Sequence, residues 1–321
     1  MSRKREHLYY IDFLRIVSCI AVMVAHAHLE FVDRCYWSVL MFTLISGAMM
    51  LGRKELDIKK LYSKNILRIF TAFLIWSFIY AVTSHVIFPV MDGEPVRIKL
   101  MITSIVEGHF HLWYCYMLIG LYIVSPCIKA MLECEEKYGL YLMAVAFVFS
   151  ILIPSFQNIK VLEWTKSVTD SIGLSGLRFL FYYILGYYII KYDFTDLQRR
   201  IVYIAGVLSA VIYFCFPGGT FMYVWESGFV SGLFVAARYL TVIGNDRVKK
   251  TFYILGDAVF LTYLMHDMFN MIFKRFFSDH ITKWYDLNLF LFTCILSFSF
   301  SLFIKYILKM VHKTDKDILI K

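Results

Sequence analysis

Three polar residues stand at regular spacing in an otherwise apolar segment near the N-terminus, namely Asp12, Arg15 and His26. In a helix, eleven residues complete about three full turns, so Arg15 and His26 share one face about 16 Å apart. Asp12 lies three residues before Arg15, close enough to pair with it. Arginine binds phosphate, and histidine has the unperturbed pKa best suited to a base at neutral pH. The spacing therefore predicts one helix face that binds an anion and removes a proton.

The same residues also have a structural interpretation. Asp12 and Arg15 are then an anchor at the membrane surface, and His26 is a hydrogen-bonded packing residue. A charge at mid-bilayer costs about 2.5–3.5 kcal/mol on insertion scales, so an ionisable group in an apolar segment needs a partner, a water-filled cavity or a function. Spacing alone leaves both interpretations open.

The composition indicates that membrane helices carry these residues. Of 321 residues, 60% are hydrophobic and 18% are charged, whereas soluble domains are about 45–50% apolar and about 25% charged. A bilayer core takes about 20 mostly apolar residues per helix. We expect about ten helices, at 8–30, 36–51, 66–90, 104–128, 140–154, 172–190, 201–216, 221–241, 251–273 and 285–308. The predicted fold is all-α, a polytopic membrane protein with residues 1–321 in a single transmembrane domain.

Lysine and arginine in the connections predict the orientation. With the N-terminus in the cytoplasm, 21 of the 33 basic residues face the cytoplasm and eight face the other side. We therefore expect both termini in the cytoplasm and the protein in the plasma or inner membrane, in contact with lipid. This asymmetry accounts for the net charge of +9, so no nucleic-acid partner is expected. Four basic residues remain within apolar segments: Arg15, Arg68, Arg178 and Arg238. The last two lie close to span ends and are interpreted as anchors.

Five short motifs follow one another along the chain. They are Asp12-x-x-Arg15-x10-His26, Phe42-Thr-Leu-Ile-Ser46-Gly47, Lys64-Asn65-Ile-Leu-Arg68-Ile69, His111-Leu-Trp113-Tyr114 with Gly120-Leu-Tyr122 and Ser125-Pro126, and Leu255-Gly256 with Tyr263-Leu-Met-His266. In this order they resemble the acyltransferase-3 family, integral membrane enzymes that O-acylate surface polysaccharides, and especially its compact stand-alone members. The chain departs from the family pattern at Thr43 (an aromatic residue is common), at Asn65 (the first of two arginines) and at Gly256 (usually serine).

The resemblance implies transfer of an acyl group, expected to be acetyl, from cytoplasmic acyl-CoA to a hydroxyl of a surface glycan or its lipid-linked precursor. Acyl-CoA is then a co-substrate, and no tightly bound cofactor or metal is expected. His26 is the expected base or transient acyl carrier, and Arg15, Arg68 and Lys64 are expected to bind the donor. The residues expected to bind the acceptor or support the site are Asp12, Ser46, His111, Trp113, Tyr122, Tyr263 and His266.

Several of these residues keep alternative interpretations. His266 is equally consistent with a packing role, and Trp113 with an aromatic belt at the membrane surface. His109 and His111 lie two residues apart without a neighbouring carboxylate or cysteine pair, which is poor evidence for a metal site. Glu226, near an expected outer helix end, is interpreted as solvated.

The alternative function is export of a polysaccharide or an acylated metabolite. Transporters favour repeated halves and helices broken by Gly or Pro at the substrate site. This chain has only five prolines and no visible repeat. The enzyme interpretation is therefore favoured. A sensory or scaffolding role would explain the apolar composition but not the spacing of Arg15 and His26.

Overall fold

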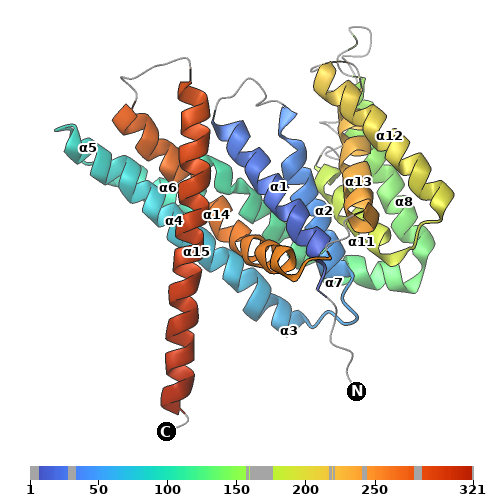
Figure 1. Cartoon of the computed structure of the whole chain (residues 1–321), viewed down its shortest axis with the longest axis horizontal. Helices are drawn as coiled ribbons and strands as arrows, with labels where there is room; N and C mark the ends of the chain where they lie inside the picture. Colours follow the sequence, from blue (N-terminus) through green and yellow to red (C-terminus); the bar gives the residue numbers. More distant parts are fainter. Residues whose placement is uncertain are drawn as a thin grey trace. The chain divides into compact units, whose positions relative to one another are not determined.

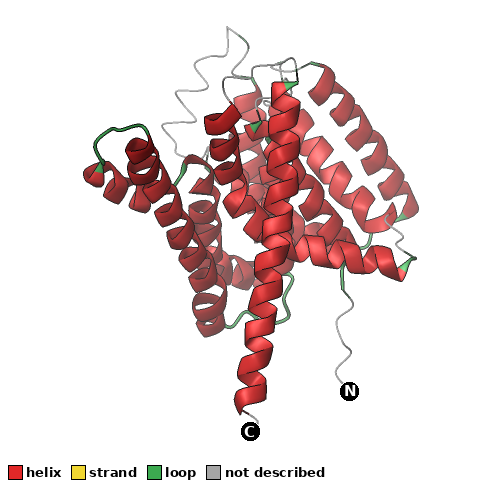
Figure 2. Ribbon diagram, turned by 60° about the vertical axis from the view of Figure 1, so that its left-hand side comes forward, coloured by secondary structure: helices red, strands yellow, loops and turns green. Residues whose placement is uncertain are grey.

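The computed structural model of the chain describes residues 7–27, 34–156, 159, 176–216, 219, 221–240, 244–277 and 284–319. Every regular element in these ranges is helical (Figure 2), which confirms the predicted all-α class. The basic leader at 3–5 lies outside the described residues.

Figure 1 labels the main helices in chain order. Their bounds are α1 (Tyr9–His26), α2 (Trp37–Leu51), α3 (Ile58–Lys60), η2 (Leu61–Ile66), α4 (Leu67–Val82), η3 (Thr83–Ile87), α5 (Phe88–Met91), α6 (Ile98–Glu107), η4 (Phe110–Leu112), α7 (Trp113–Cys134), α8 (Glu136–Phe147), η5 (Val148–Leu152), α9 (Ile153–Ser155), α11 (Leu177–Lys191), α12 (Asp196–Cys215), α13 (Met222–Leu240), α14 (Asp246–Phe277) and α15 (Tyr285–Leu319).

Within the described ranges, six helical segments are long and apolar enough to cross a membrane. They are Tyr9–His26, Ile58–Met91, Ile98–Cys134, Glu136–Ser155, Asp196–Cys215 and Tyr285–Val311. The expected number of about ten spans is therefore not confirmed. α2 and α11 are shorter, with 15 residues each, and α14 carries buried polar residues along its length. The predicted orientation of the termini stays a prediction.

The structure places a helix break inside one of the expected spans. The expected span at 104–128 is interrupted at Gly108, which ends α6 with a φ of 78°. This left-handed backbone conformation is open to glycine at little cost. The chain passes through the short helix η4 and begins α7 at Trp113. His109 therefore directly precedes η4, and His111 lies within it.

The chain divides into two compact units. Unit 1 comprises Met1–Phe42, Phe194–Gly218 and Trp225–Lys321, and unit 2 comprises Thr43–Asp193 and Gly219–Val224. In unit 1, α1 packs against α14 and α15, and α14 and α15 lie side by side (Figure 1). In unit 2, α4 packs against α6 and α7, while α8 packs against α7 and α11.

Two glycines bring α2 and α11 into backbone contact in unit 2. A Cβ added at Gly47 would lie 1.8 Å from the Tyr183 carbonyl oxygen, and one at Gly186 would lie 2.0 Å from the Leu44 carbonyl oxygen. Small residues allow membrane helices to approach this closely and gain van der Waals contact. Gly47, part of the second motif, is thus a packing residue. The core beside this crossing contains Met50, Leu51, Leu121, Ile128, Tyr183 and Ile184.

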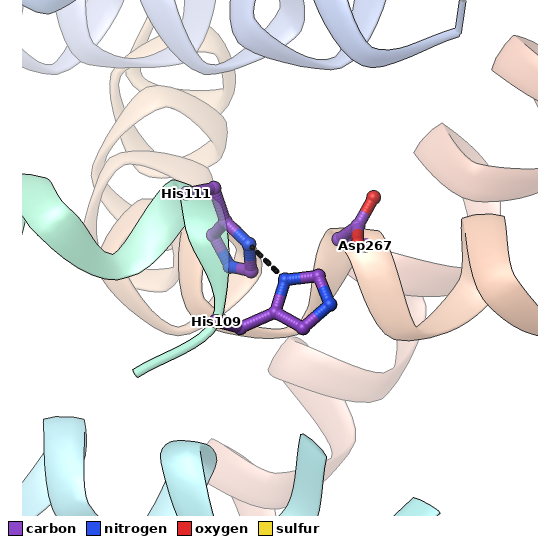
Figure 3. A group of neighbouring side chains, drawn as sticks. All are labelled: His109, His111 and Asp267. Atoms are coloured by element: carbon purple, nitrogen blue, oxygen red, sulfur yellow. Dashed lines mark hydrogen bonds between the residues drawn. The ribbon is translucent and has the colours of Figure 1, made fainter. Parts of the chain in front are cut away.

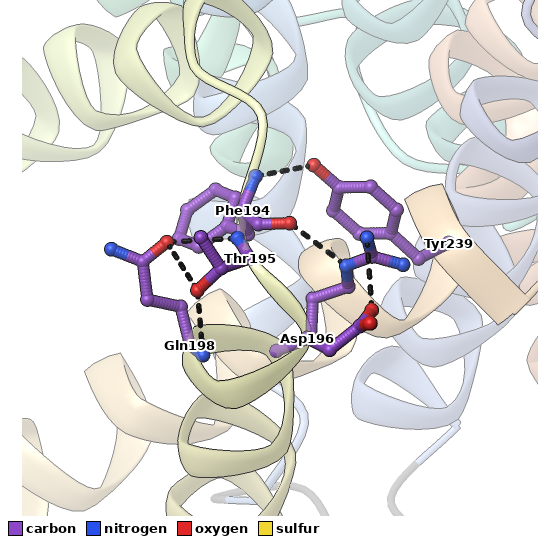
Figure 4. Close-up of polar contacts among 6 residues, drawn as sticks. Phe194, Thr195, Asp196, Gln198 and Tyr239 are labelled. Carbon is purple, nitrogen blue, oxygen red and sulfur yellow. Dashed lines mark hydrogen bonds and ion pairs between the residues drawn. The ribbon is translucent and has the colours of Figure 1, made fainter.

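A capping box starts α12 in unit 1 (Figure 4). The Thr195 hydroxyl accepts the Gln198 backbone N–H at 3.3 Å, and the Gln198 side chain accepts the Thr195 backbone N–H at 2.9 Å. The preceding residue is held as well, because the Phe194 N–H donates to the Tyr239 hydroxyl at 2.9 Å. Reciprocal bonds of this kind satisfy backbone donors that the first helical turn leaves without partners.

Thr195→Ala is expected to destabilise the folded protein by about 1 kcal/mol, because alanine cannot accept the Gln198 N–H. The measurement is thermal or denaturant unfolding of the detergent-solubilised protein. Thr195→Ser is the matched control, since it keeps the hydroxyl and should unfold like the wild type. Equal loss in both variants would show that the threonine methyl group, rather than the cap, is responsible.

Candidate active site

The predicted pairing of Asp12 with Arg15 is confirmed at the start of α1. Arg15 Nη1 lies 3.5 Å from Asp12 Oδ1. The Asp12 side chain is only 3% exposed, whereas that of Arg15 is 34% exposed. A second partner comes from the residues before the helix, because His7 Nε2 bonds Asp12 Oδ2. His7 was not among the sequence candidates, since it lies outside the apolar segment.

Gly256 of α14 faces the Asp12 side chain. A Cβ at Gly256 would lie 2.6 Å from the Asp12 Cβ and 2.7 Å from its Cγ. The buried carboxylate thus occupies the space that a side chain on α14 would fill. A serine at this position would therefore require the Asp12 side chain or α14 to move.

The other end of α1 brings together residues about 240 positions apart in the sequence. The rings of His26 and His266 are stacked with centroids 5.1 Å apart and an interplanar angle of 29°. His266 Nδ1 lies 2.6 Å from the Tyr263 carbonyl oxygen. A carbonyl only accepts hydrogen bonds, so this nitrogen carries the proton, and neutral His266 has its lone pair on Nε2. The expected residues His26, Tyr263 and His266 therefore form one cluster within unit 1.

Several buried polar contacts join α14 to α15. The Thr262 hydroxyl donates to Ser301 Oγ at 2.9 Å. One turn beyond His266, the Asn270 side chain donates to Asp267 Oδ1 at 3.1 Å and accepts the Thr293 hydroxyl at 2.5 Å. Buried polar groups paired in this way help to fix helix register and rotation. They hold α14 in the rotation that presents His266 to His26.

In unit 2, the predicted donor residues Lys64 and Arg68 stand four positions apart, and both are exposed. Lys64 belongs to η2, a stretch of wider π-helical turns that continues into α4. Such turns are frequent at functional sites. Asn65, which replaces a family arginine, accepts a hydrogen bond from Arg53 Nη1 at 3.2 Å. The guanidinium of Arg53 therefore lies beside Asn65, although the arginine of the family motif is missing. The spacing of the motif residues did not predict this position of Arg53.

The helix that leads to Lys64 begins at an acidic cap. Asp57 Oδ1 accepts the Lys60 backbone N–H at 3.2 Å, and Oδ2 lies 3.2 Å from the Lys60 ammonium. These contacts lower the pKa of Asp57. A carboxyl with a lowered folded-state pKa stabilises the fold above its unfolded-state pKa and loses that contribution as the pH falls through the folded-state value. The cap is therefore ionised and intact at neutral pH.

The histidines before α7 form a compact group with an aromatic residue of α4. His109 Nδ1 and His111 Nδ1 lie 3.3 Å apart (Figure 3). The Tyr80 ring lies 4.3 Å from the His109 ring and 5.3 Å from the His111 ring, centroid to centroid. His111 is buried. Asp267, also drawn in Figure 3, belongs to unit 1 and to the α14 contacts described above.

The remaining expected site residues of unit 2 divide into two groups. Trp113 is 37% exposed and packs on Phe179 with ring centroids 5.6 Å apart. Ser46 shares a side-chain hydrogen bond with buried Tyr114. Tyr122 lies close enough to Tyr114 for an electrostatic interaction between the hydroxyl groups. Ser46 thus belongs to a set of hydroxyl contacts between α2 and α7, a type of contact that also joins membrane helices without any catalytic role.

The expectation that Glu226 is solvated is wrong. The residue is 2% exposed, and the Tyr213 hydroxyl of α12 donates to its Oε1 at 3.4 Å. A buried carboxylate needs hydrogen-bond donors, because its transfer from water is costly. Position near a helix end gave no sign of this packing.

The comparison of the chain with protein families agrees with the resemblance that the sequence motifs indicate. A family model described as an acyltransferase domain, that of the acyltransferase-3 family, matches residues 8–306, which include the motifs of both units. Comparisons with curated proteins and with solved structures give no significant match. The match covers nearly the whole chain, and the described residues contain several apolar helices. The chain therefore belongs to the acyltransferase-3 family and is a membrane acyltransferase.

Proposed function

We propose that the protein transfers an acetyl group from cytoplasmic acetyl-CoA to a hydroxyl of a surface polysaccharide or its lipid-linked precursor. The observation that carries this proposal is the contact between His26 and His266 at one end of α1, with the Asp12–Arg15 pair at the other. One end of α1 offers a cation for an anionic donor, and the other offers an imidazole for proton transfer.

In the proposed reaction, His26 removes the proton from the acceptor hydroxyl, and the oxygen attacks the thioester carbonyl. A tetrahedral adduct forms and collapses as the carbon–sulfur bond breaks, and the CoA thiolate leaves with the proton. A base positioned in this way contributes about 10²–10⁴-fold. In the alternative route, His26 itself attacks the thioester carbonyl, the carbon–sulfur bond breaks, and the CoA thiolate leaves with the ring proton of His26. The acceptor hydroxyl then attacks the acyl-imidazole, and its proton returns to the released imidazole. Arg15, Lys64 and Arg68 bind the phosphates of the donor in both routes.

Stacking assists the base in this proposal. His266 is fixed by its bond to the Tyr263 carbonyl group, so the His26 ring rests against a ring that does not rotate. A base that is already held in one orientation loses less conformational entropy when the transition state forms. His266 and Tyr263 therefore act as positioning residues for His26.

The direct test uses purified protein in proteoliposomes with radiolabelled acetyl-CoA, together with mass spectrometry of the surface glycan from cells with and without the gene. We expect one acetyl group per modified sugar only when the gene is present. Label retained on the protein in the absence of an acceptor supports the acyl-carrier route, and its absence supports direct transfer. Unchanged glycan chemistry together with lost export would contradict the proposal and favour the exporter.

A further inference from the structure

His7 completes a three-residue cluster at the start of α1. Its Nε2 bonds one oxygen of the Asp12 carboxylate, and Arg15 Nη1 lies 3.5 Å from the other. The His7 side chain is 41% exposed and that of Asp12 is 3% exposed. A carboxylate only accepts hydrogen bonds, so His7 Nε2 carries a proton and donates. Both oxygens of the buried carboxylate thus have a partner.

Packing holds His7 in this place. Its ring makes edge contacts with Tyr9, at 4.8 Å between centroids, and with Tyr253 of α14, at 5.1 Å. The absent side chain of Gly256 leaves room on α14 for the carboxylate itself. The cluster is therefore built from three segments: the residues before α1, α1 itself and α14.

The charges around the cluster are largely balanced. Asp257 of α14 acts on Asp12 electrostatically and forms an ion pair with Lys305 of α15. The charge of Asp257 is therefore met by Lys305, and the Asp12 carboxylate is left for His7 and Arg15. His7 and Arg15 share the two oxygens of the Asp12 carboxylate. The fewer of these oxygens Arg15 contacts, the more of its N–H groups are available to a ligand.

Arginine and a carboxylate ordinarily form two parallel hydrogen bonds, the strongest arrangement open to them. Here His7 occupies Asp12 Oδ2, and Arg15 makes one long contact with Oδ1. A guanidinium has five N–H donors, so this single contact leaves donors of Arg15 available for a ligand. Without His7, both carboxylate oxygens could receive Arg15.

We propose that His7 is a positioning residue for donor binding. It holds one oxygen of Asp12 and so keeps Arg15 available to a phosphate group of acyl-CoA. This inference rests on the proposed function, because it assumes a phosphorylated donor at Arg15. His7 touches neither reacting atom and affects affinity for the donor rather than the chemical step.

Two substitutions separate the hydrogen bond from the ring. His7→Phe keeps an aromatic ring against Tyr9 and Tyr253 but removes the donor to Asp12. His7→Gln keeps an N–H donor at about the position of Nε2 and removes the ring. We expect His7→Phe to raise the KM for acetyl-CoA and the Kd for CoA about tenfold, the effect of losing one charge-assisted bond, with kcat within about twofold of wild type. His7→Gln should keep both constants within about twofold.

The measurements are initial rates in proteoliposomes and equilibrium binding of CoA alone, with thermal unfolding to verify that each variant is folded. Wild-type constants in folded His7→Phe would overturn the inference. Equal weakening in both variants would also overturn it, because the ring rather than the hydrogen bond would then be responsible. A wild-type protein that binds CoA but transfers no acetyl group would instead contradict the proposed function, while the binding constants would still test the role of His7.

Discussion

His26→Ala is expected to lower kcat for acetyl transfer by about 10³-fold, with a much smaller change in the KM for acetyl-CoA. In the proposed reaction, alanine removes the imidazole that takes the proton or carries the acyl group. Arg15, about 16 Å away along α1, is unchanged and should still bind the donor. The measurement is the initial rate of label transfer in proteoliposomes, with the acetyl-CoA concentration varied to separate kcat from KM.

His85→Gln is the matched control for His26→Ala. His85 is also a helical histidine, and its Nε2 lies 2.9 Å from the Ser104 hydroxyl, outside the groups assigned to the reaction. The control should transfer acetyl within about twofold of the wild-type rate. A folded His26→Ala protein with wild-type kcat would exclude His26 as both base and carrier.

Gly47→Ala is expected to destabilise the folded protein by about 3 kcal/mol or more, although it adds only one methyl group. The added Cβ would lie 1.8 Å from the Tyr183 carbonyl oxygen, far inside van der Waals contact. Backbone atoms cannot change rotamer to make room, so α2 and α11 must separate along their whole crossing. The measurement is the yield of monodisperse detergent-solubilised protein and its unfolding temperature.

Gly120→Ala provides the comparison for that prediction. Gly120 lies within α7, and an added Cβ would have nothing within 4 Å. Alanine favours a helix by about 1 kcal/mol relative to glycine, so this variant should be as stable as the wild type or slightly more stable. If Gly47→Ala and Gly120→Ala unfold at the same temperature, the close crossing of α2 and α11 is not present in the protein.

Local spacing predicted the contacts that depend on local geometry. The Asp12–Arg15 pair follows from three residues of helix, and the structure contains it. The contact between His26 and His266 does not follow from spacing, because it depends on the packing of α1 against α14. Resemblance brought His266 into the candidate set, but only the fold places its ring against His26.

Other features could not be predicted because their cause lies in a distant segment. Gly47 marks a motif in the sequence, and its role becomes visible only in the backbone of α11. His7 lies before the apolar segment and acquires a role through Asp12 and Tyr253. The break at Gly108 did have a local signal, a glycine directly before His109, but the apolar residues on both sides favoured a continuous span.

The order in which the helices are synthesised determines when the polar contacts between α14 and α15 can form. His26 emerges from the ribosome early, and its neighbour His266 follows about 240 residues later. The helix that carries His266 obtains partners for Thr262 and Asn270 only when Ser301 and Thr293 of α15 have been synthesised and inserted. The rotation of α14 that places His266 against His26 is therefore fixed only after α15 has been inserted beside α14.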